Sequence, residues 1–90
     1  MVTFDKEKNR KNINKHGLEL SFGSIVLKDK NLIEALDGRM NYGEERWNAL
    51  GMVDGKIYAV TYTERSNGQH FISVRLADRR EADTYMKSVT

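Results

Sequence analysis

Two dipeptides in the second half of the chain constrain its fold more than any other feature. Asp54-Gly55 and Asn67-Gly68 are the pairs that best suit type I′ turns, because both central residues of such a turn need positive φ. Each pair lies between segments in which apolar and polar residues alternate, as they do in half-buried strands. The alternating segments are residues 45–53, 56–64 and 70–76. The sequence therefore predicts a three-stranded antiparallel meander.

Two-residue turns would also fix the register of this meander, and with it the face on which each side chain lies. The predicted partners are Arg46 and Thr63, Trp47 and Tyr62, Leu50 and Ala59, Tyr62 and Ser73, and Val60 and Arg75. The predicted core face carries Leu50, Met52, Ile57, Ala59, Ile72, Val74 and Leu76. The opposite face mixes aromatic, hydroxyl and charged groups: Trp47, Tyr58, Val60, Tyr62, Glu64, Phe71, Ser73 and Arg75. Such a mixture fits either a supporting aromatic cluster or a ligand-binding surface.

Capping residues predict one helix near the N-terminus and one near the C-terminus. Asp5 suits the N-cap of a helix over residues 6–16, and Gly17 suits the left-handed position that ends it. Asp78 and Glu81 have the spacing of a capping box. The C-terminal helix that follows has apolar residues spaced to dock on the sheet, namely Ala82, Tyr85, Met86 and Val89.

The segment between the first helix and the meander is less regular. Residues 18–27 fit a second short helix, residues 32–36 a short strand and residues 37–44 a loop. The predicted fold class is therefore α+β, with two N-terminal helices, a small antiparallel sheet and a C-terminal helix.

The composition indicates one small domain over residues 1–90. The chain has no cysteine, so disulfides and thiolate metal sites are not expected, and a reducing cytoplasm suits it. No apolar stretch has the length of a signal peptide or a membrane span. A cytoplasmic location is expected.

The net charge of +2 is modest, but the positive charge is unevenly distributed. Residues 6–16 contain Lys6, Lys8, Arg10, Lys11, Lys15 and His16 against the single acid Glu7. Lys8, Lys11 and Lys15 are spaced to share one helix face. This face suits either a solvated surface or contact with phosphate or an acidic protein.

The residue types leave few catalytic chemistries open. His16 and His70 are far apart, no acidic cluster has metal-ligand spacing, and neither a phosphate loop nor a nucleophile elbow is present. No metal or cofactor is expected. Cleavage of RNA without a metal needs a base for the 2′-hydroxyl, a proton donor for the leaving oxygen, and cations for the phosphorane.

Side chains suited to each of these roles are present. The cations are Arg46, Arg65 and Arg75, the proton carriers are Glu64, His16 and Tyr62, and the aromatic rings that could stack on bases are Trp47 and Tyr62. These side chains also have simpler structural explanations. Arg75 and Glu64, for example, would suit a cross-strand ion pair.

An ordered set of short motifs resembles the BrnT toxin family. The motifs are Phe4-Asp5, Lys8-Asn9, Asn12, Lys15-His16-Gly17, Gly43-Glu44-Glu45-Arg46, Leu50-Gly51, Tyr62-Thr63-Glu64-Arg65, Ile72-Ser73-Val74-Arg75-Leu76-Ala77, and Glu81 with Tyr85. The resemblance implies a RelE-like ribonuclease fold and a type II toxin that cuts RNA without a metal and slows translation. It also implies a BrnA-like antitoxin, expected as a dimer that carries two toxins and binds operator DNA.

The resemblance places the family's motif residues on this chain. By resemblance, the family's motif residues fall on Lys15, His16, Gly17, Arg46, Arg65, Ser73 and Arg75. Together with the residues chosen for their chemistry, the candidate catalytic set is Arg75, Arg65, Arg46, Glu64 and His16, and the candidate RNA-binding set is Lys15, Tyr62, Trp47, Ser73, Lys8 and Lys11. Two positions depart from the family pattern, because Phe4 replaces a tryptophan and Gly23 replaces a residue that favours helix. The alternative is a non-catalytic module with the toxin fold that only binds an antitoxin or DNA-binding partner.

Overall fold

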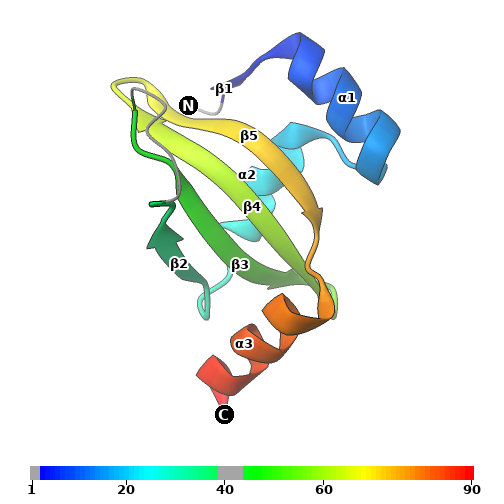
Figure 1. The fold of residues 1–90 in the computed structure, drawn as a ribbon, viewed down its shortest axis with the longest axis vertical. Coiled ribbons are helices and arrows are strands. Elements are labelled where there is room, and N and C mark those ends of the chain that lie inside the picture. The colour runs from blue at the N-terminus through cyan, green and yellow to red at the C-terminus, as the bar shows by residue number, and fades with distance from the viewer. Residues whose placement is uncertain (1–2, 39–43) are drawn as a thin grey trace.

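The computed structural model describes residues 3–38 and 44–90, so most of the loop predicted at 37–44 lies outside the described residues. Within the described ranges, five strands form one mixed sheet in the order β1-β5-β4-β3-β2, with helices around it (Figure 1). The elements are β1 (Thr3–Phe4), α1 (Lys6–His16), the 3-10 helix η1 (Leu20–Phe22), α2 (Gly23–Val26), β2 (Ile33–Leu36), β3 (Trp47–Val53), β4 (Lys56–Arg65), β5 (Gly68–Leu76) and α3 (Arg79–Val89). The α+β class predicted from the sequence is confirmed. None of these helices has the length and apolar character needed to cross a bilayer.

The sheet is larger than the predicted meander. Strands β3, β4 and β5 pair antiparallel as expected, and β2 extends them antiparallel to β3, with Ile33 opposite Leu50. On the other edge, β1 pairs with β5 in parallel, with Phe4 opposite Phe71. The prediction of an entirely antiparallel sheet is therefore wrong, because the last strand, β5, lies beside the first strand, β1, and runs parallel to it.

The two hairpins differ in how well their turn residues predict their register. In the first, Asp54 and Gly55 have positive φ, 50° and 81°, and Trp47 lies opposite Tyr62 as predicted. In the second, Arg65 pairs with Gly68, so the turn residues are Ser66 and Asn67 and the predicted Asn67-Gly68 turn is wrong.

A register shift between Thr61 and Tyr62 in β4 leaves the strands beyond it one residue out of the predicted register. Tyr62 faces Phe71 and not Ser73, while Thr61 faces Ser73. Arg75 lies opposite Ala59 and not Val60. Since neighbouring residues of a strand point to opposite faces, this one-residue difference places Arg75 on the face away from Tyr62.

The core lies on the sheet face that was predicted to be the exposed one. Its buried residues are Leu20, Val26, Ala49, Tyr58, Val60, Tyr62, Phe71 and Val74, with Trp47 packed against them. Of the predicted core face, Val74 and Ala59 are buried, but Leu50, Met52, Ile57 and Ile72 are only half-buried and Leu76 is 54% exposed. Strand β4 is apolar on both faces, and the helices cover the face with the aromatic rings, which bury the most apolar area.

Helix α1 has the predicted bounds and caps. Asp5 accepts a hydrogen bond from the backbone N–H of Glu7 (2.9 Å), and Gly17 takes the left-handed conformation with φ 72°. Its contact with the sheet is polar, because Asn12 is the residue buried in this helix. Ile13, an apolar residue of the same helix, is 40% exposed.

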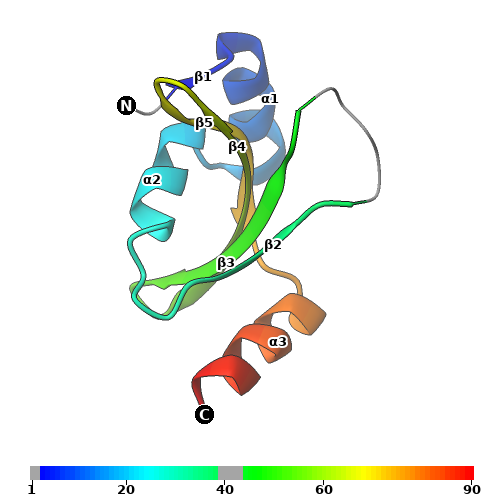
Figure 2. The same ribbon diagram turned by 90° about the vertical axis from the view of Figure 1, so that its left-hand side faces the viewer.

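The second helix predicted over residues 18–27 is broken into η1 and α2. These short turns pack on the sheet at very close range, with α2 on one side of the curved strands (Figure 2). A Cβ at Gly23 would lie 2.7 Å from Cδ1 of Phe71, and one at Gly51 would lie 2.7 Å from the carbonyl oxygen of Val26. Both glycines therefore permit a contact that a larger residue would prevent.

Helix α3 begins at the predicted capping box and lies beyond one end of the sheet (Figure 2). Tyr85 is its buried residue, and the Tyr85 hydroxyl donates a short hydrogen bond to the Asp29 carboxylate. Burial, with this hydrogen bond, raises the pKa of Tyr85 to about 12. Met86 and Val89 were expected to dock on the sheet but are exposed, so α3 is anchored mainly by its first two turns.

Candidate functional site

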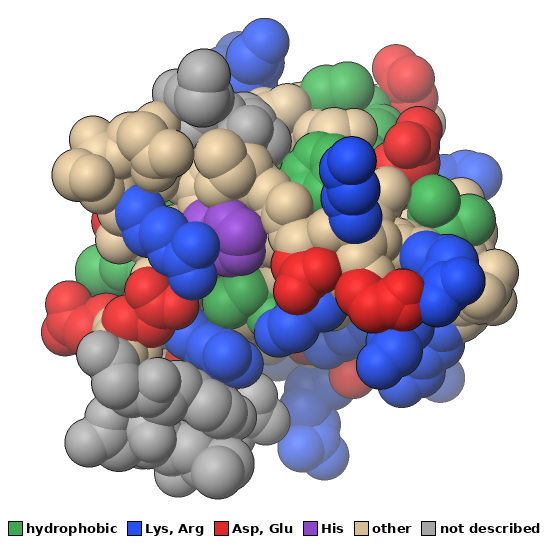
Figure 3. Space-filling model, turned by 90° about the horizontal axis from the view of Figure 1, so that it is seen from above, with side chains coloured by type: hydrophobic (Ala, Val, Ile, Leu, Met, Phe, Trp, Pro, Cys, Tyr) green, Lys and Arg blue, Asp and Glu red, His purple; other side chains and the backbone are tan. Residues whose placement is uncertain are grey.

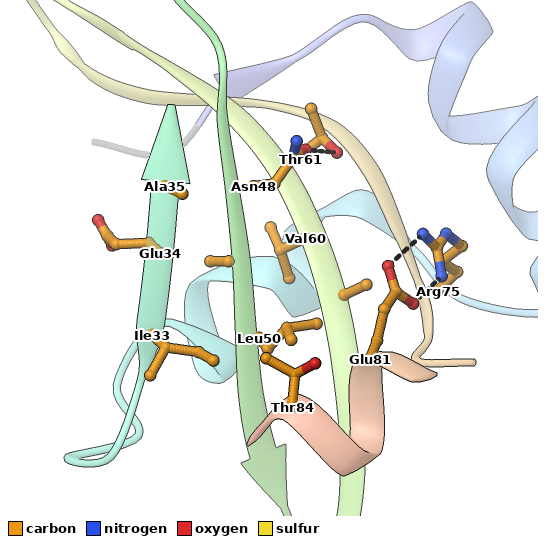
Figure 4. Close-up of a pocket in the computed structure, with 12 residues that line it drawn as sticks. Ile33, Glu34, Ala35, Asn48, Leu50, Val60, Thr61, Arg75, Glu81 and Thr84 are labelled. Carbon is orange, nitrogen blue, oxygen red and sulfur yellow. Dashed lines mark hydrogen bonds and ion pairs between the residues drawn. The ribbon is translucent and has the colours of Figure 1, made fainter. Parts of the chain in front are cut away.

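The sheet face opposite the core, which we call the open face, is covered at one end by α3 and carries a cavity of about 360 Å³ (Figure 4). Its lining residues come from β2, β3, β4, β5 and α3 and include Ile33, Asn48, Leu50, Ala59, Thr61, Arg75, Glu81 and Thr84. Aliphatic residues such as Leu50 and Ala59 line it together with the polar residues Asn48 and Thr61. The cavity therefore combines an apolar surface with an arginine at its edge.

Arg75 is directed by a carboxylate from the first turn of α3. Its Nη1 and Nη2 donate parallel hydrogen bonds to Oε1 and Oε2 of Glu81, at 2.7 and 2.9 Å (Figure 4). The bond from Arg75 lowers the pKa of Glu81, so this carboxyl is ionised at neutral pH. The predicted pairing of Arg75 with Glu64 is wrong, since Glu64 lies across from Gln69 and is exposed.

The basic face of α1 lies beside the same strand. Lys8, Lys11, Lys15 and His16 line a shallow groove of about 240 Å³ with Asn12, Ile72 and Ser73. The prediction that the three lysines share one helix face is confirmed. Because Ser73 and Arg75 are alternate residues of β5, this groove continues toward the open face.

His16 lies in a positive environment at the end of this groove. Burial lowers its pKa, and the positive charges of Lys15 and Arg75 lower it further. The ring is therefore neutral at neutral pH and can accept a proton. The influence of Arg75 on His16 links the α1 groove to the open-face cavity electrostatically.

Two of the predicted arginines lie away from Arg75. Arg65 is at the tip of the second hairpin, where its Nη2 donates to Oε1 of Glu44 at 3.0 Å. Arg46 directly precedes β3, and its backbone carbonyl accepts a hydrogen bond from the N–H of Asp37 (2.7 Å). Neither arginine lines the open-face cavity or the α1 groove.

The end of the molecule that holds α1 and the second hairpin carries mixed charge. Seen from above, lysine and arginine side chains are interspersed with acidic ones around a histidine (Figure 3). His70 shares a 2.7 Å hydrogen bond with the hydroxyl of Thr3 on the adjacent strand. Attraction of an anion here depends on the local grooves, because no broad single-sign surface forms in this view.

The two aromatic residues expected to stack on RNA bases belong to the core face. Tyr62 is 4% exposed, and its hydroxyl donates to the Glu34 carboxylate (2.8 Å to Oε2). Burial raises the pKa of Tyr62, and the bond to Glu34 raises it further. Trp47 packs against the same core. The assignment of Tyr62 as an RNA-binding residue is corrected, since its ring is buried on the side of the sheet that faces the helices. Trp47 is half-buried on the same side, and its assignment stays a prediction.

Three polar residues that the sequence reasoning did not assign help to form the site. On the open face, the Thr61 hydroxyl donates to Oδ1 of Asn48 (2.8 Å). These two residues face each other in the correctly predicted first hairpin, so the register itself was a signal for this pair. Asn12 fixes α1 to β5, because its side chain donates to the carbonyl of Val74 (2.7 Å) and accepts from the Val74 N–H (3.2 Å).

The fold and the site together define a small α+β protein with basic side chains gathered along one strand, β5. The family model described as the ribonuclease toxin BrnT of a type II toxin-antitoxin system matches residues 4–81. The chain therefore belongs to the BrnT family of ribonuclease toxins, which confirms the family prediction. A comparison with curated proteins gives no match. Membership of a type II toxin family implies an antitoxin as the partner.

Proposed function

We propose that this protein is a toxin with a RelE-like fold that cleaves RNA internally without a metal ion and so inhibits translation in the cytoplasm. The observation that carries the proposal is the position of Arg75, which lines the open-face cavity two residues along β5 from Ser73 of the basic α1 groove. Family membership supplies the reaction class. A BrnA-like antitoxin, as a dimer that carries two toxins and binds operator DNA, would neutralise it.

The charges beside β5 suit an RNA strand that crosses this edge of the sheet. Lys8, Lys11 and Lys15 hold backbone phosphates along the α1 groove, and the hydroxyl of Ser73 contacts the same strand. The RNA continues onto the open face, where the cavity accepts a nucleotide next to the scissile phosphate. The charges of Arg46 and Arg65, which line neither the cavity nor the groove, contribute long-range attraction.

The reaction uses side chains of this region as base and cation, and water as the proton donor. The base takes the proton of the 2′-hydroxyl, the 2′-oxygen bonds to phosphorus, and the P–O5′ bond breaks as the 5′-oxygen gains a proton from water. The products are a 2′,3′-cyclic phosphate and a 5′-hydroxyl end. Arg75 stabilises the charge of the phosphorane, since its guanidinium is permanently positive and matches two phosphate oxygens. His16 is the base we favour over Glu64, because it lines the groove.

Purified protein incubated with RNA and excess EDTA tests this function. We expect cleavage to persist, and the products to carry 5′-hydroxyl ends that a polynucleotide kinase labels directly. Expression without the antitoxin gene should arrest growth, and co-expression should restore it. Tight antitoxin binding with no cleavage of any RNA would instead identify a non-catalytic module, and cleavage abolished by EDTA would contradict the metal-independent mechanism.

The proton-carrier role of His16 predicts a specific pH dependence. A base acts in its neutral form, and the pKa of His16 lies below its ordinary value of 6.5. The cleavage rate should therefore rise with pH under acidic conditions and become constant before neutrality. His16→Gln should lower kcat about 100-fold, as expected for loss of a general base, and should remove this rise.

His70→Gln is the matched control, because the pKa of His70 is also lowered, first by burial, but its ring is bonded to Thr3. This variant should keep the pH profile of the wild type. A wild-type profile in His16→Gln would exclude His16 as the base and favour Glu64.

A further inference from the structure

The hydrogen bonds of Arg75 leave one edge of its guanidinium unoccupied. Glu81 takes the end of the group through Nη1 and Nη2, and Nη1 also donates to the backbone carbonyl of Leu76 at 3.3 Å. The remaining N–H groups are on Nε and Nη2 and point along a second edge of the planar group. Within residues 3–38 and 44–90, no side chain or carbonyl accepts a hydrogen bond from this second edge.

The carboxylate of Glu81 is itself held by the start of α3. Its Oε1 accepts a hydrogen bond from the backbone N–H of Asp78 (2.9 Å), while Asp78 Oδ1 accepts from the N–H of Glu81 (2.8 Å). The Glu81 carboxylate is thus held by the backbone N–H of Asp78, whereas the Asp78 side chain caps the backbone of the first turn. The direction of the Arg75 guanidinium is therefore set by the backbone at which α3 begins.

An arginine edge with two parallel N–H groups matches two oxygens of a phosphate. We propose that Glu81 is a positioning residue, which orients Arg75 so that its Nε and Nη2 bind the scissile phosphate together. The inference rests on the proposed function, and it gives α3 a part in catalysis beyond closing one end of the cavity. Without Glu81, the Arg75 side chain would be free to rotate before RNA binds. Its ordering on binding would then cost conformational entropy and lower the cleavage rate.

Glu81→Gln tests the inference with little change in shape. Glutamine also serves at this position of a capping box, so α3 keeps its start, but one charge-assisted bond to Arg75 is lost. We expect kcat for RNA cleavage to fall about 10-fold, with a smaller change in KM, because the phosphorane needs both donors. In an Arg75→Lys background, which has no second edge to orient, the same change should alter kcat less than about twofold.

Asp78→Ala is the matched control for helix stability. It removes the N-cap of the same turn, at a cost of about 1 kcal/mol to the helix, but leaves both bonds between Arg75 and Glu81. Its kcat should stay within about twofold of the wild type, at folded fractions verified by circular dichroism. Equal losses in Asp78→Ala and Glu81→Gln, or an undiminished loss in the Arg75→Lys background, would overturn the positioning role. An inactive wild-type protein would overturn the proposed function and this inference together.

Discussion

Replacing Arg75 with alanine is expected to lower kcat for RNA cleavage at least about 100-fold, the usual effect of removing a donor to a developing oxyanion. The residue lines the open-face cavity two positions along β5 from Ser73 of the α1 groove, and its guanidinium is held by Glu81. Loss of this cation removes the side chain best placed to stabilise the phosphorane. Cleavage of a defined RNA by the purified variant measures the effect, and loss of toxicity on expression provides a second readout.

The fold should tolerate this change. The Arg75 side chain is 37% exposed, so its ion pair with Glu81 is partly screened by solvent and should contribute no more than about 1 kcal/mol to the free energy of unfolding. Arg10→Ala is the matched control, because it also removes an arginine that pairs with a glutamate, Glu7, but on the exposed side of α1. Equal loss of cleavage in the two variants would show that Arg75 acts only through net charge.

Elements with complete local signals were predictable from the sequence. Helix α1 has an aspartate cap and a left-handed glycine at its ends, and α3 has both halves of a capping box. The first hairpin has two turn residues with positive φ, as the Asp54-Gly55 pair requires. In each case the deciding interaction lies within a few residues of the sequence that specifies it.

Elements that depend on distant contacts were not predictable in this way. The two residues of β1 have no pattern of their own, and their strand is defined by parallel pairing with β5. The segment predicted as a helix at residues 18–27 forms the short turns η1 and α2, and the close approach of Gly23 to Phe71 there depends on a residue distant in the sequence. The core face of the meander was assigned to the wrong side because β4 is apolar on both sides. A single register shift between β4 and β5 then places Arg75 on the face away from Tyr62.

The same distinction applies to the candidate site. Spacing alone identified the basic face of α1, and the structure places it beside Ser73 and within electrostatic reach of Arg75. Tyr62 was assigned to RNA through the incorrect face, and it belongs to the core. The contact between Arg75 and Glu81 was missed. The capping role of Glu81 already explained why a glutamate is present, so no partner for it on the sheet was sought.

Asn12→Ala is expected to give the largest loss of stability among single changes in α1. The side chain is 7% exposed and bonds to the N–H and carbonyl of Val74 and to the carbonyl of Leu18 (2.8 Å). Alanine would leave these backbone groups without that partner, and each unsatisfied buried group costs about 1–3 kcal/mol. We expect the free energy of unfolding to fall by about 3 kcal/mol in urea titrations.

Asn14→Ala supplies the control for this prediction, because it makes the same substitution at an exposed position of the same helix. Alanine favours helix more than asparagine, so this variant should be neutral or slightly more stable than the wild type. Since Asn12 also holds the lysines of α1 against β5, Asn12→Ala should weaken RNA binding even at temperatures where it remains folded. Similar unfolding midpoints for the two variants would show that the polar contact between α1 and β5 does not stabilise the fold.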